Sequence, residues 1–330
     1  MDSRLCKGGS PSARSRRGEP LASLRMRRVI AATTLNADGQ GDSHVPANSI
    51  RSLHRSFGKS IGRLAPEWVV DRYRHWTTDA YVVSFPKSGR TWFRTMLGTA
   101  LQLQFGTRAV DPTSVHLMWM LDPNVPRLLF THDVNAHLNH VDAIGWDGQR
   151  YRNKKTILLV RDPRDTIVSL YYEMTKRVRA YDGPIDAFIR QEAGGIASLV
   201  AFLNGWMRNL HQIRESLLLT YEDLHGQPHA AVRAALAFVG AGEVSEDNIA
   251  EAIRLSSFEA MRRMERAGEV GHVRLRPGDV ADPQSYKVRS GRIGGYREVL
   301  SPRDCAFLDD YIARHLDPRL ARYKHGVTAG

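Results

Sequence analysis

The chain is poor in cysteine, in lysine and in long apolar runs. Only Cys6 and Cys305 are cysteines among its 330 residues, which excludes a disulfide scaffold and favours a reducing compartment. The apolar stretch at 29–35 is far shorter than the roughly 20 residues that a membrane-spanning helix needs. We therefore expect a cytoplasmic protein without a transmembrane segment, and its 42% of hydrophobic residues suffices for one sizeable core.

Basic residues outnumber acidic ones in this chain, and most of the basic residues are arginine. The net charge is +12, and only 8 of the 47 basic residues are lysine. Arginine binds phosphate and sulfate through paired hydrogen bonds and stays charged when buried, so this balance indicates an anionic ligand. A nucleic-acid-binding basic protein is the alternative from another class. No zinc-ligand spacing, aromatic RNA-binding motif or basic heptad pattern accompanies the charge, so no nucleic-acid partner is expected.

Two regions of the chain differ in their patterning. Residues 1–62 lack sustained periodicity, and residues 1–28 carry eight basic side chains against Asp2 and Glu19. We predict that 1–62 is a disordered, arginine-rich N-terminal extension, which either binds something acidic or has no role of its own. Over 63–330, apolar runs alternate with amphipathic stretches, which predicts one domain with a parallel sheet and crossover helices.

The expected strands and helices alternate along this domain. The four predicted strands are the apolar runs 79–85, 127–131, 155–160 and 217–220. A helix is predicted at 91–105, where apolar residues recur with helical spacing. Another follows the third strand, because Asp162 suits an N-cap and Pro163 suits the first helical position; a last helix is expected at about 302–315. This order predicts an α/β, P-loop-like three-layer fold with a central, mainly parallel β-sheet flanked by helices.

The turn after the first predicted strand has the composition of an anion-binding loop. Its sequence, Pro-Lys-Ser-Gly-Arg-Thr-Trp over 86–92, leads directly into a helix, so backbone N–H groups at the helix start would point at the anion. The candidate anion-binding residues are Lys87, Ser88, Gly89, Arg90, Thr91 and Trp92. The alternative enzyme class, a P-loop-like phosphotransferase, would have a Walker A lysine after a second glycine, whereas Lys87 precedes the only glycine here.

A second candidate phosphate site follows the third predicted strand. Arg161 stands at the carboxyl end of this strand, where open α/β sheets bind ligands, and Ser169 lies two turns into the next helix. A guanidinium and a hydroxyl at this edge could hold a further phosphate group. Taken alone, the segment could equally be a helix cap provided by Asp162.

These two segments together resemble the phosphate motifs of soluble sulfotransferases, which use 3′-phosphoadenosine-5′-phosphosulfate (PAPS) as sulfuryl donor. The order P-K-S-G-x-T-W resembles the 5′-phosphosulfate loop of that family, and the spacing from Arg161 to Ser169 resembles its 3′-phosphate motif. The resemblance covers roughly residues 68–316 and implies a sulfotransferase domain over 63–330. It implies PAPS as cosubstrate, PAP as product, and no metal.

The same resemblance implies contacts with the adenosine and its 3′-phosphate. The residues implied are Tyr221, Ser256, Phe258, Arg289, Ser290 and Gly291. The segment around Arg289 is similar to the family motif R-K-G-x-x-G-D-W-K, although Ser290 replaces its lysine. Trp92 would stack on the base. Core packing is the alternative interpretation for the aromatic residues of this group.

The resemblance also implies a catalytic base. Phe130-Thr131-His132 is similar to the K-T-H segment that carries the catalytic histidine of the family, and a histidine pKa suits a base near neutral pH. The implied mechanism is in-line displacement, in which His132 takes the proton of the acceptor and Lys87 stabilises the leaving phosphate. Phe130 replaces the lysine of the family. Asp133 could orient His132, act as the base itself or be solvated, and His132 could be a satisfied histidine at a strand end.

No motif identifies the acceptor. The expected partner is a small-molecule, glycan or lipid acceptor with a hydroxyl or an amine, held by the variable segments 107–126, 133–152 and 178–196. Trp119 and Trp146 in these segments could line an apolar or sugar-stacking pocket, and core packing explains them equally well.

Overall fold

The structure is a computed structural model, and it describes residues 66–108, 110–133, 135–146, 148–268 and 275–325. The predicted N-terminal extension, residues 1–62, lies outside the described residues. Its expected disorder therefore stays a prediction.

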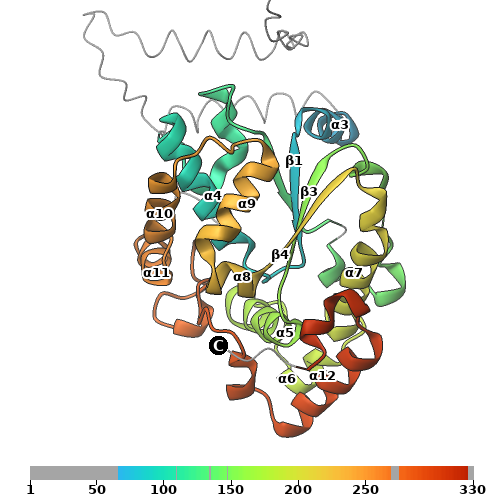
Figure 1. Cartoon of the computed structure of the whole chain (residues 1–330). Helices are drawn as coiled ribbons and strands as arrows, with labels where there is room; N and C mark the ends of the chain where they lie inside the picture. Colours follow the sequence, from blue (N-terminus) through green and yellow to red (C-terminus); the bar gives the residue numbers. More distant parts are fainter. Residues whose placement is uncertain (1–65, 109, 134, 147, 269–274, 326–330) are drawn as a thin grey trace, which may run out of the picture. The chain divides into compact units, whose positions relative to one another are not determined.

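Four parallel strands form one sheet in the described part of the chain (Figure 1). They are β1 (Ala80–Ser84), β2 (Leu128–Thr131), β3 (Lys155–Val160) and β4 (Glu215–Thr220), in the order β2-β1-β3-β4. In the register, Val82 of β1 lies opposite Phe130 on one side and Ile157 on the other. Strands β1 and β3 are apolar and almost wholly buried, as parallel strands covered on both faces must be. All four predicted strands are confirmed.

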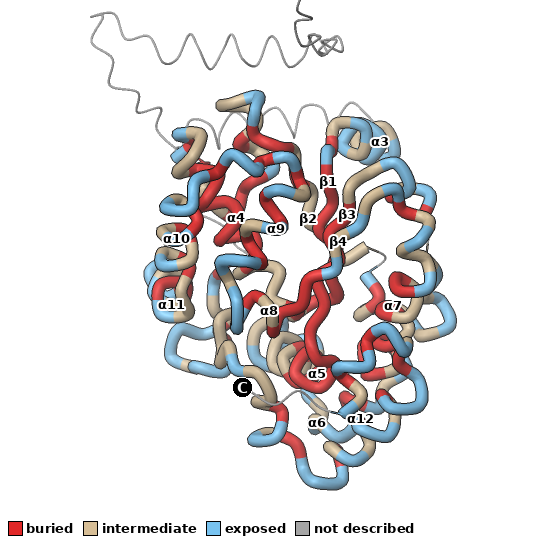
Figure 2. The backbone as a smooth tube through the Cα atoms, viewed as in Figure 1, coloured by how far each residue is buried: buried red, intermediate tan, exposed pale blue. Residues whose placement is uncertain are grey.

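Helices cover both faces of the sheet, so the predicted three-layer α/β fold is confirmed (Figure 2). Each face of the sheet has its own hydrophobic core, and alternate residues of β1 point into one or the other. Ala80 and Val82 pack with α4, α9 and α10, whereas Tyr81 and Val83 pack with α5, α7 and α12. The helices are α3 (Glu67–Thr77), α4 (Arg90–Phe105), α5 (Pro163–Tyr172), α6 (Ile185–Ile189), α7 (Ile196–Asn209), α8 (Tyr221–Gly226), α9 (Pro228–Val239), α10 (Glu246–Leu255), α11 (Phe258–Ala267) and α12 (Pro302–His315).

Local sequence signals explain where the helices next to the sheet edge begin. The Asp162 side chain accepts a hydrogen bond from the Arg164 backbone N–H at 2.8 Å, and Pro163 occupies the first turn of α5, so the predicted cap is confirmed. Helix α12 begins at Pro302 after the Ser301 cap, as predicted. Helix α4 starts after Gly89, whose φ of 89° favours a residue without a Cβ.

The carboxyl edge of the sheet is where the chain turns in opposite directions. After β1 it enters α4 on one face, and after β3 it enters α5 on the other. Such an edge is where open parallel sheets bind ligands. Within the ranges that the structure describes, no helix is both long and apolar enough to cross a bilayer.

Candidate active site

The carboxyl ends of the strands bring the separate candidate segments together. Arg161, directly after β3, donates hydrogen bonds to the carbonyl oxygens of Lys87 at 3.3 Å and of Arg292 at 3.0 Å. One guanidinium thus touches both the turn after β1 and the C-terminal segment around 289–292. The sequence predicts that the turn after β1 and the C-terminal segment belong to one site, and such a site requires them to lie this close.

The turn over 86–89 has the backbone shape of an anion nest. Lys87 and Gly89 both have positive φ, 70° and 89°, and Ser88 between them does not, an alternation of backbone conformation that is typical of anion nests. A Cβ on Gly89 would lie 2.5 Å from Cδ2 of Tyr221. Positive φ is costly for lysine, and the fold holds Lys87 in it. Ser88 is buried in this turn, and Thr91 is partly buried in the first turn of α4.

An ion pair orients the Lys87 side chain. Its ammonium lies 2.7 Å from Oε2 of Glu173, and Glu173 also binds Arg177. Burial would raise the pKa of Glu173, but Lys87 and Arg177 outweigh burial and lower this pKa to about 2. Glu173 therefore stays ionised at neutral pH. It opens a π-helical turn, Glu173–Arg177, that continues α5, a distortion that is frequent at functional sites.

One face of α5 carries the residues that meet the rest of the site. Asp165 accepts hydrogen bonds from the backbone N–H groups of Gly294 at 2.7 Å and of Tyr296 at 3.0 Å. Ser169 lies one turn further along and is partly buried, and Glu173 follows one turn after it. Residues four apart share a helix face, so Ser169 lies between the anchor of the C-terminal loop and the partner of Lys87.

The residues expected at the adenosine also contact one another. The Tyr221 hydroxyl donates to the Gly291 carbonyl oxygen at 3.0 Å, and the Arg161 guanidinium lies 4.2 Å from the Tyr221 ring centre. Trp92 stands edge-on to Tyr221, with ring centres 5.6 Å apart, and its Nε1 donates to the Ser256 carbonyl oxygen at 2.8 Å. These aromatic contacts join the first loop, α8 and the C-terminal segment.

The C-terminal segment is held by a buried carboxylate. Glu265 accepts the backbone N–H groups of Lys287 at 2.6 Å and of Val288 at 2.9 Å. Beyond it, Arg289 lies over the Tyr172 ring at 4.2 Å, and Ser290 next to it is partly buried. The Phe258 ring packs so closely on Gly291 that a Cβ there would lie 2.8 Å from its Cδ2.

His132 follows β2 and is fixed through both ring nitrogens. Its Nδ1 lies 2.9 Å from the Ser84 carbonyl oxygen, which can only accept, so Nδ1 carries the proton. Its Nε2 then accepts from the Arg90 guanidinium at 2.6 Å. Burial, with Arg90 as the second cause, lowers the pKa of His132 to about 2. The ring is therefore neutral, with its basic nitrogen directed at the anion-binding loop.

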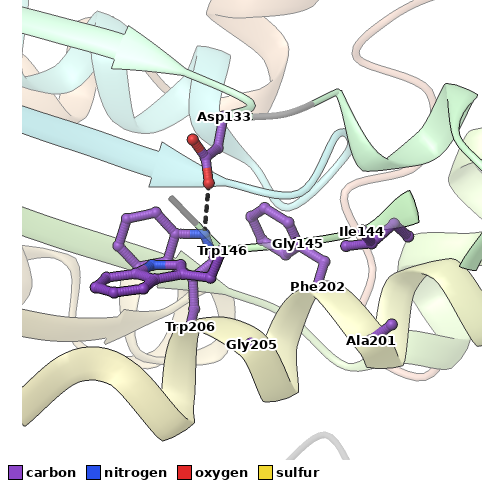
Figure 3. A pocket seen from close by; sticks show the side chains of 8 residues that line it. All are labelled: Asp133, Ile144, Gly145, Trp146, Ala201, Phe202, Gly205 and Trp206. Atoms are coloured by element: carbon purple, nitrogen blue, oxygen red, sulfur yellow. Dashed lines mark hydrogen bonds between the residues drawn. The ribbon is translucent and has the colours of Figure 1, made fainter. Parts of the chain in front are cut away.

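The carboxylate of Asp133 is engaged away from the loop. It accepts the Tyr151 hydroxyl at 2.6 Å and the Trp206 Nε1–H at 3.1 Å. Both oxygens are therefore bonded, which argues against the solvated alternative. Figure 3 shows the Trp206 bond beside a small pocket between the loop after β2 and α7. The pocket is lined by Asp133, Ile144, Gly145, Trp146, Ala201, Phe202, Gly205 and Trp206.

A model of the sulfotransferase domain family matches residues 77–319 of the chain. This chain belongs to the sulfotransferase family. Membership supports sulfuryl transfer as its general activity.

Known sulfotransferases match this one at modest identity. Cytosolic sulfotransferase 12 of Arabidopsis thaliana is 25% identical over 256 residues, covering 70% of this chain and 74% of the relative. Sulfotransferase 1A1 of Bos taurus is 26% identical over 249 residues, covering 68% and 78%. The crystal structure of mouse sulfotransferase SULT7A1 complexed with PAP has a TM-score of 0.51 at 16% identity, covering 76% of this chain and 90% of that one. This structural likeness concerns the fold.

Two charged groups at the site of this sulfotransferase, Glu173 and Lys287, were not predicted from the sequence. Glu173 could have been suspected from its spacing of four from Ser169 on the same helix face. Lys287 carries no such signal. Burial, and then the charge of Lys87, lower the pKa of Lys287 to about 7, so this second cation lies in the electrostatic environment of Lys87.

Two further expectations concern the acceptor segments and metals. Trp119 packs against Arg127, whereas Trp146 lines the pocket beside Asp133. Among the described residues, no group of three or more His, Cys, Asp or Glu side chains is arranged to hold a metal ion.

Proposed function

We propose that this sulfotransferase transfers the sulfuryl group of PAPS to a hydroxyl or amine of a small-molecule, glycan or lipid acceptor, with His132 as base. The observation that carries the proposal is the position of Arg161, which touches the backbone of both nucleotide segments. A doubly phosphorylated adenosine needs cationic groups at both ends, and Lys87 and Arg161 would supply one each.

Buried polar atoms near these groups fit such a ligand. Among the described residues, Nε of Arg161, Nε of Arg289, Oγ of Ser256 and Oγ1 of Thr166 are buried and have no hydrogen-bond partner. Buried polar groups are rarely left without partners. Burial lowers the pKa of the Arg289 guanidinium, and the charge of Arg161 lowers it further. An anion between these two guanidinium groups would relieve their repulsion, which supports a 3′-phosphate site there.

The chemistry assigned to the residues is an in-line displacement. The bond between sulfur and the 5′-phosphate oxygen breaks, and a bond from sulfur to the acceptor oxygen or nitrogen forms. Nε2 of His132 takes the proton that the acceptor loses. Lys87 and the N–H groups of the turn over 86–89 stabilise the charge on the leaving 5′-phosphate. PAP and the sulfated acceptor are the products.

The relatives support the donor and the compartment. The solved relative from mouse is complexed with PAP, and the plant relative is named cytosolic. We infer the same donor and a cytoplasmic location for this chain.

Ligand-induced stabilisation tests the proposal. PAP with a chelator should raise the melting temperature, by an amount equivalent to about 2.7 kcal/mol at a hundredfold excess over Kd. ATP with Mg²⁺ should have little effect. A mass-spectrometric transfer screen from PAPS to phenols, steroids, glycans and lipids then finds the acceptor. Binding to nucleic acid that falls steeply with salt, without any effect of PAP, would contradict the proposal.

A further inference from the structure

Arg90 forms a hydrogen bond with Nε2 of His132, the nitrogen that must be free for His132 to act as the base. It is the first residue of α4 and stands at the variable position of the P-K-S-G-x-T-W order. Its guanidinium donates to Nε2 of His132 at 2.6 Å, while Nδ1 donates to the Ser84 carbonyl oxygen at 2.9 Å. The lone pair that would accept the proton of an acceptor is therefore already engaged.

The surroundings of His132 reinforce this state. Besides Arg90, the groups that act on its charge are the Ser84 carbonyl, His137 and Lys287. The His137 ring centre lies 6.0 Å from that of His132. Burial, Arg90, His137 and Lys287 all disfavour a second proton on the ring, whereas the Ser84 carbonyl favours it. With Arg90 in this position, His132 is a poor base at any physiological pH.

We propose that Arg90 is a positioning residue that withholds His132 until the sulfuryl donor is bound. Arg90 directly follows the turn over 86–89, where the proposed function, on which this inference rests, places the phosphosulfate. With an anionic oxygen a guanidinium gains charge–charge attraction and can form paired hydrogen bonds, neither of which a single neutral imidazole nitrogen offers. Binding of the donor then draws Arg90 from Nε2 to the anion, and the freed lone pair turns to the acceptor.

The move of Arg90 from His132 to the anion couples donor binding to activation of the base. Before donor binding, Arg90 is bonded to Nε2 of His132 and lowers the basicity of the ring. After it, the charge of Arg90 is compensated by the anion, so the pKa of His132 rises towards the range of a useful base. The inference thus predicts an ordered reaction, in which the base becomes competent only after the donor has bound.

Nitrogen-15 NMR of histidine-labelled full-length protein tests the exchange directly. A His132→Gln spectrum assigns the His132 signals, and these are titrated from pH 5 to pH 8, alone and with saturating PAP. In the free wild type we expect a neutral ring with Nδ1–H, a hydrogen-bonded Nε2 and no titration. PAP should shift the Nε2 resonance towards that of an unbonded nitrogen and bring the titration of His132 into the measured range of pH 5 to pH 8.

Variants separate Arg90 from its neighbours. In Arg90→Met the pKa of His132 should be raised even without PAP. Arg90→Lys keeps the charge but loses the planar fork, so its His132 pKa should lie between those of Arg90→Met and the wild type. Lys287→Met is the matched control, because it removes a nearby cation that is not bonded to Nε2, and it should leave the Nε2 resonance unchanged. Circular dichroism verifies the folding of each variant, and the comparison of free and PAP-bound wild type needs no variant.

Calorimetry of PAP binding distinguishes the possible failures. If PAP gives no binding heat, the proposed function fails and the donor-driven release fails with it. If PAP binds and the Nε2 resonance stays as in the free protein, the release alone is wrong. An Arg90→Met protein whose His132 titrates like the wild type would also overturn the inference.

Discussion

Replacing Glu173 by glutamine should destabilise the free protein and strengthen its response to PAP. The pKa of Glu173 is lowered from 4.5 to about 2 by Lys87 and Arg177, against the effect of burial. At about 1.4 kcal/mol for each pKa unit, this corresponds to about 3 kcal/mol of folding stability. Because the pKa is depressed in the folded state, this stability is present above about pH 4.5 and is lost as the pH falls towards 2.

The same substitution removes the carboxylate that competes with the ligand for Lys87. The ammonium lies 2.7 Å from Glu173 in the free protein, so binding of a 5′-phosphate must share or break this contact. Without the carboxylate, Lys87 is free to bind the phosphate, and PAP should bind several-fold more tightly. The stabilisation by PAP should accordingly be larger in Glu173→Gln than in the wild type.

Urea unfolding at pH 7 and at pH 3, with and without PAP, measures both effects. We expect a loss of about 3 kcal/mol at pH 7 that shrinks at pH 3. Glu251→Gln is the matched control, because Glu251 forms an exposed ion pair with Arg254 on α10, which contributes little. Equal unfolding curves for Glu173→Gln and the wild type at pH 7, or equal stabilisation by PAP, would refute the reasoning.

Three further substitutions test the roles proposed for individual side chains. Lys87→Ala should lower kcat by about 10² to 10³, the usual loss on removing one transition-state donor; steady-state kinetics with saturating PAPS would reveal an unaffected turnover if the assignment is wrong. Arg161→Ala should weaken PAP binding by roughly 10-fold to 100-fold, as expected for a charge-assisted hydrogen bond, and unchanged binding in calorimetry would contradict its place at the 3′-phosphate. His132→Ala should abolish transfer without weakening PAP binding; persisting transfer would make Asp133 the next candidate for the base.

Local signals made much of the framework predictable. The apolar run over 155–160 is confirmed as β3 with the same bounds, because a strand buried on both faces must be continuously apolar. Helix α12 also has the predicted bounds, since a Ser301 cap and Pro302 start it. The positions of Lys87 and Arg161 at one sheet edge followed from the parallel order of their strands.

Contacts between distant segments could not be predicted in the same way. The pairs Arg90 with His132 and Lys87 with Glu173 join side chains that are far apart in the sequence, and no periodicity encodes such pairs. The buried Lys287 likewise depends on how Glu265 holds the C-terminal segment. These contacts arise only once the sheet edge is assembled, and they set the charges on which the proposed chemistry depends.

A crystal structure of the chain with PAP is the most direct test of the central claim, that the turn over 86–89, Arg161 and the segment over 289–291 bind one nucleotide. We expect the 5′-phosphate on the N–H groups of the turn and the 3′-phosphate on the guanidinium groups of Arg161 and Arg289. PAP bound elsewhere, or with Arg161 still bonded only to backbone carbonyl oxygens, would contradict the account.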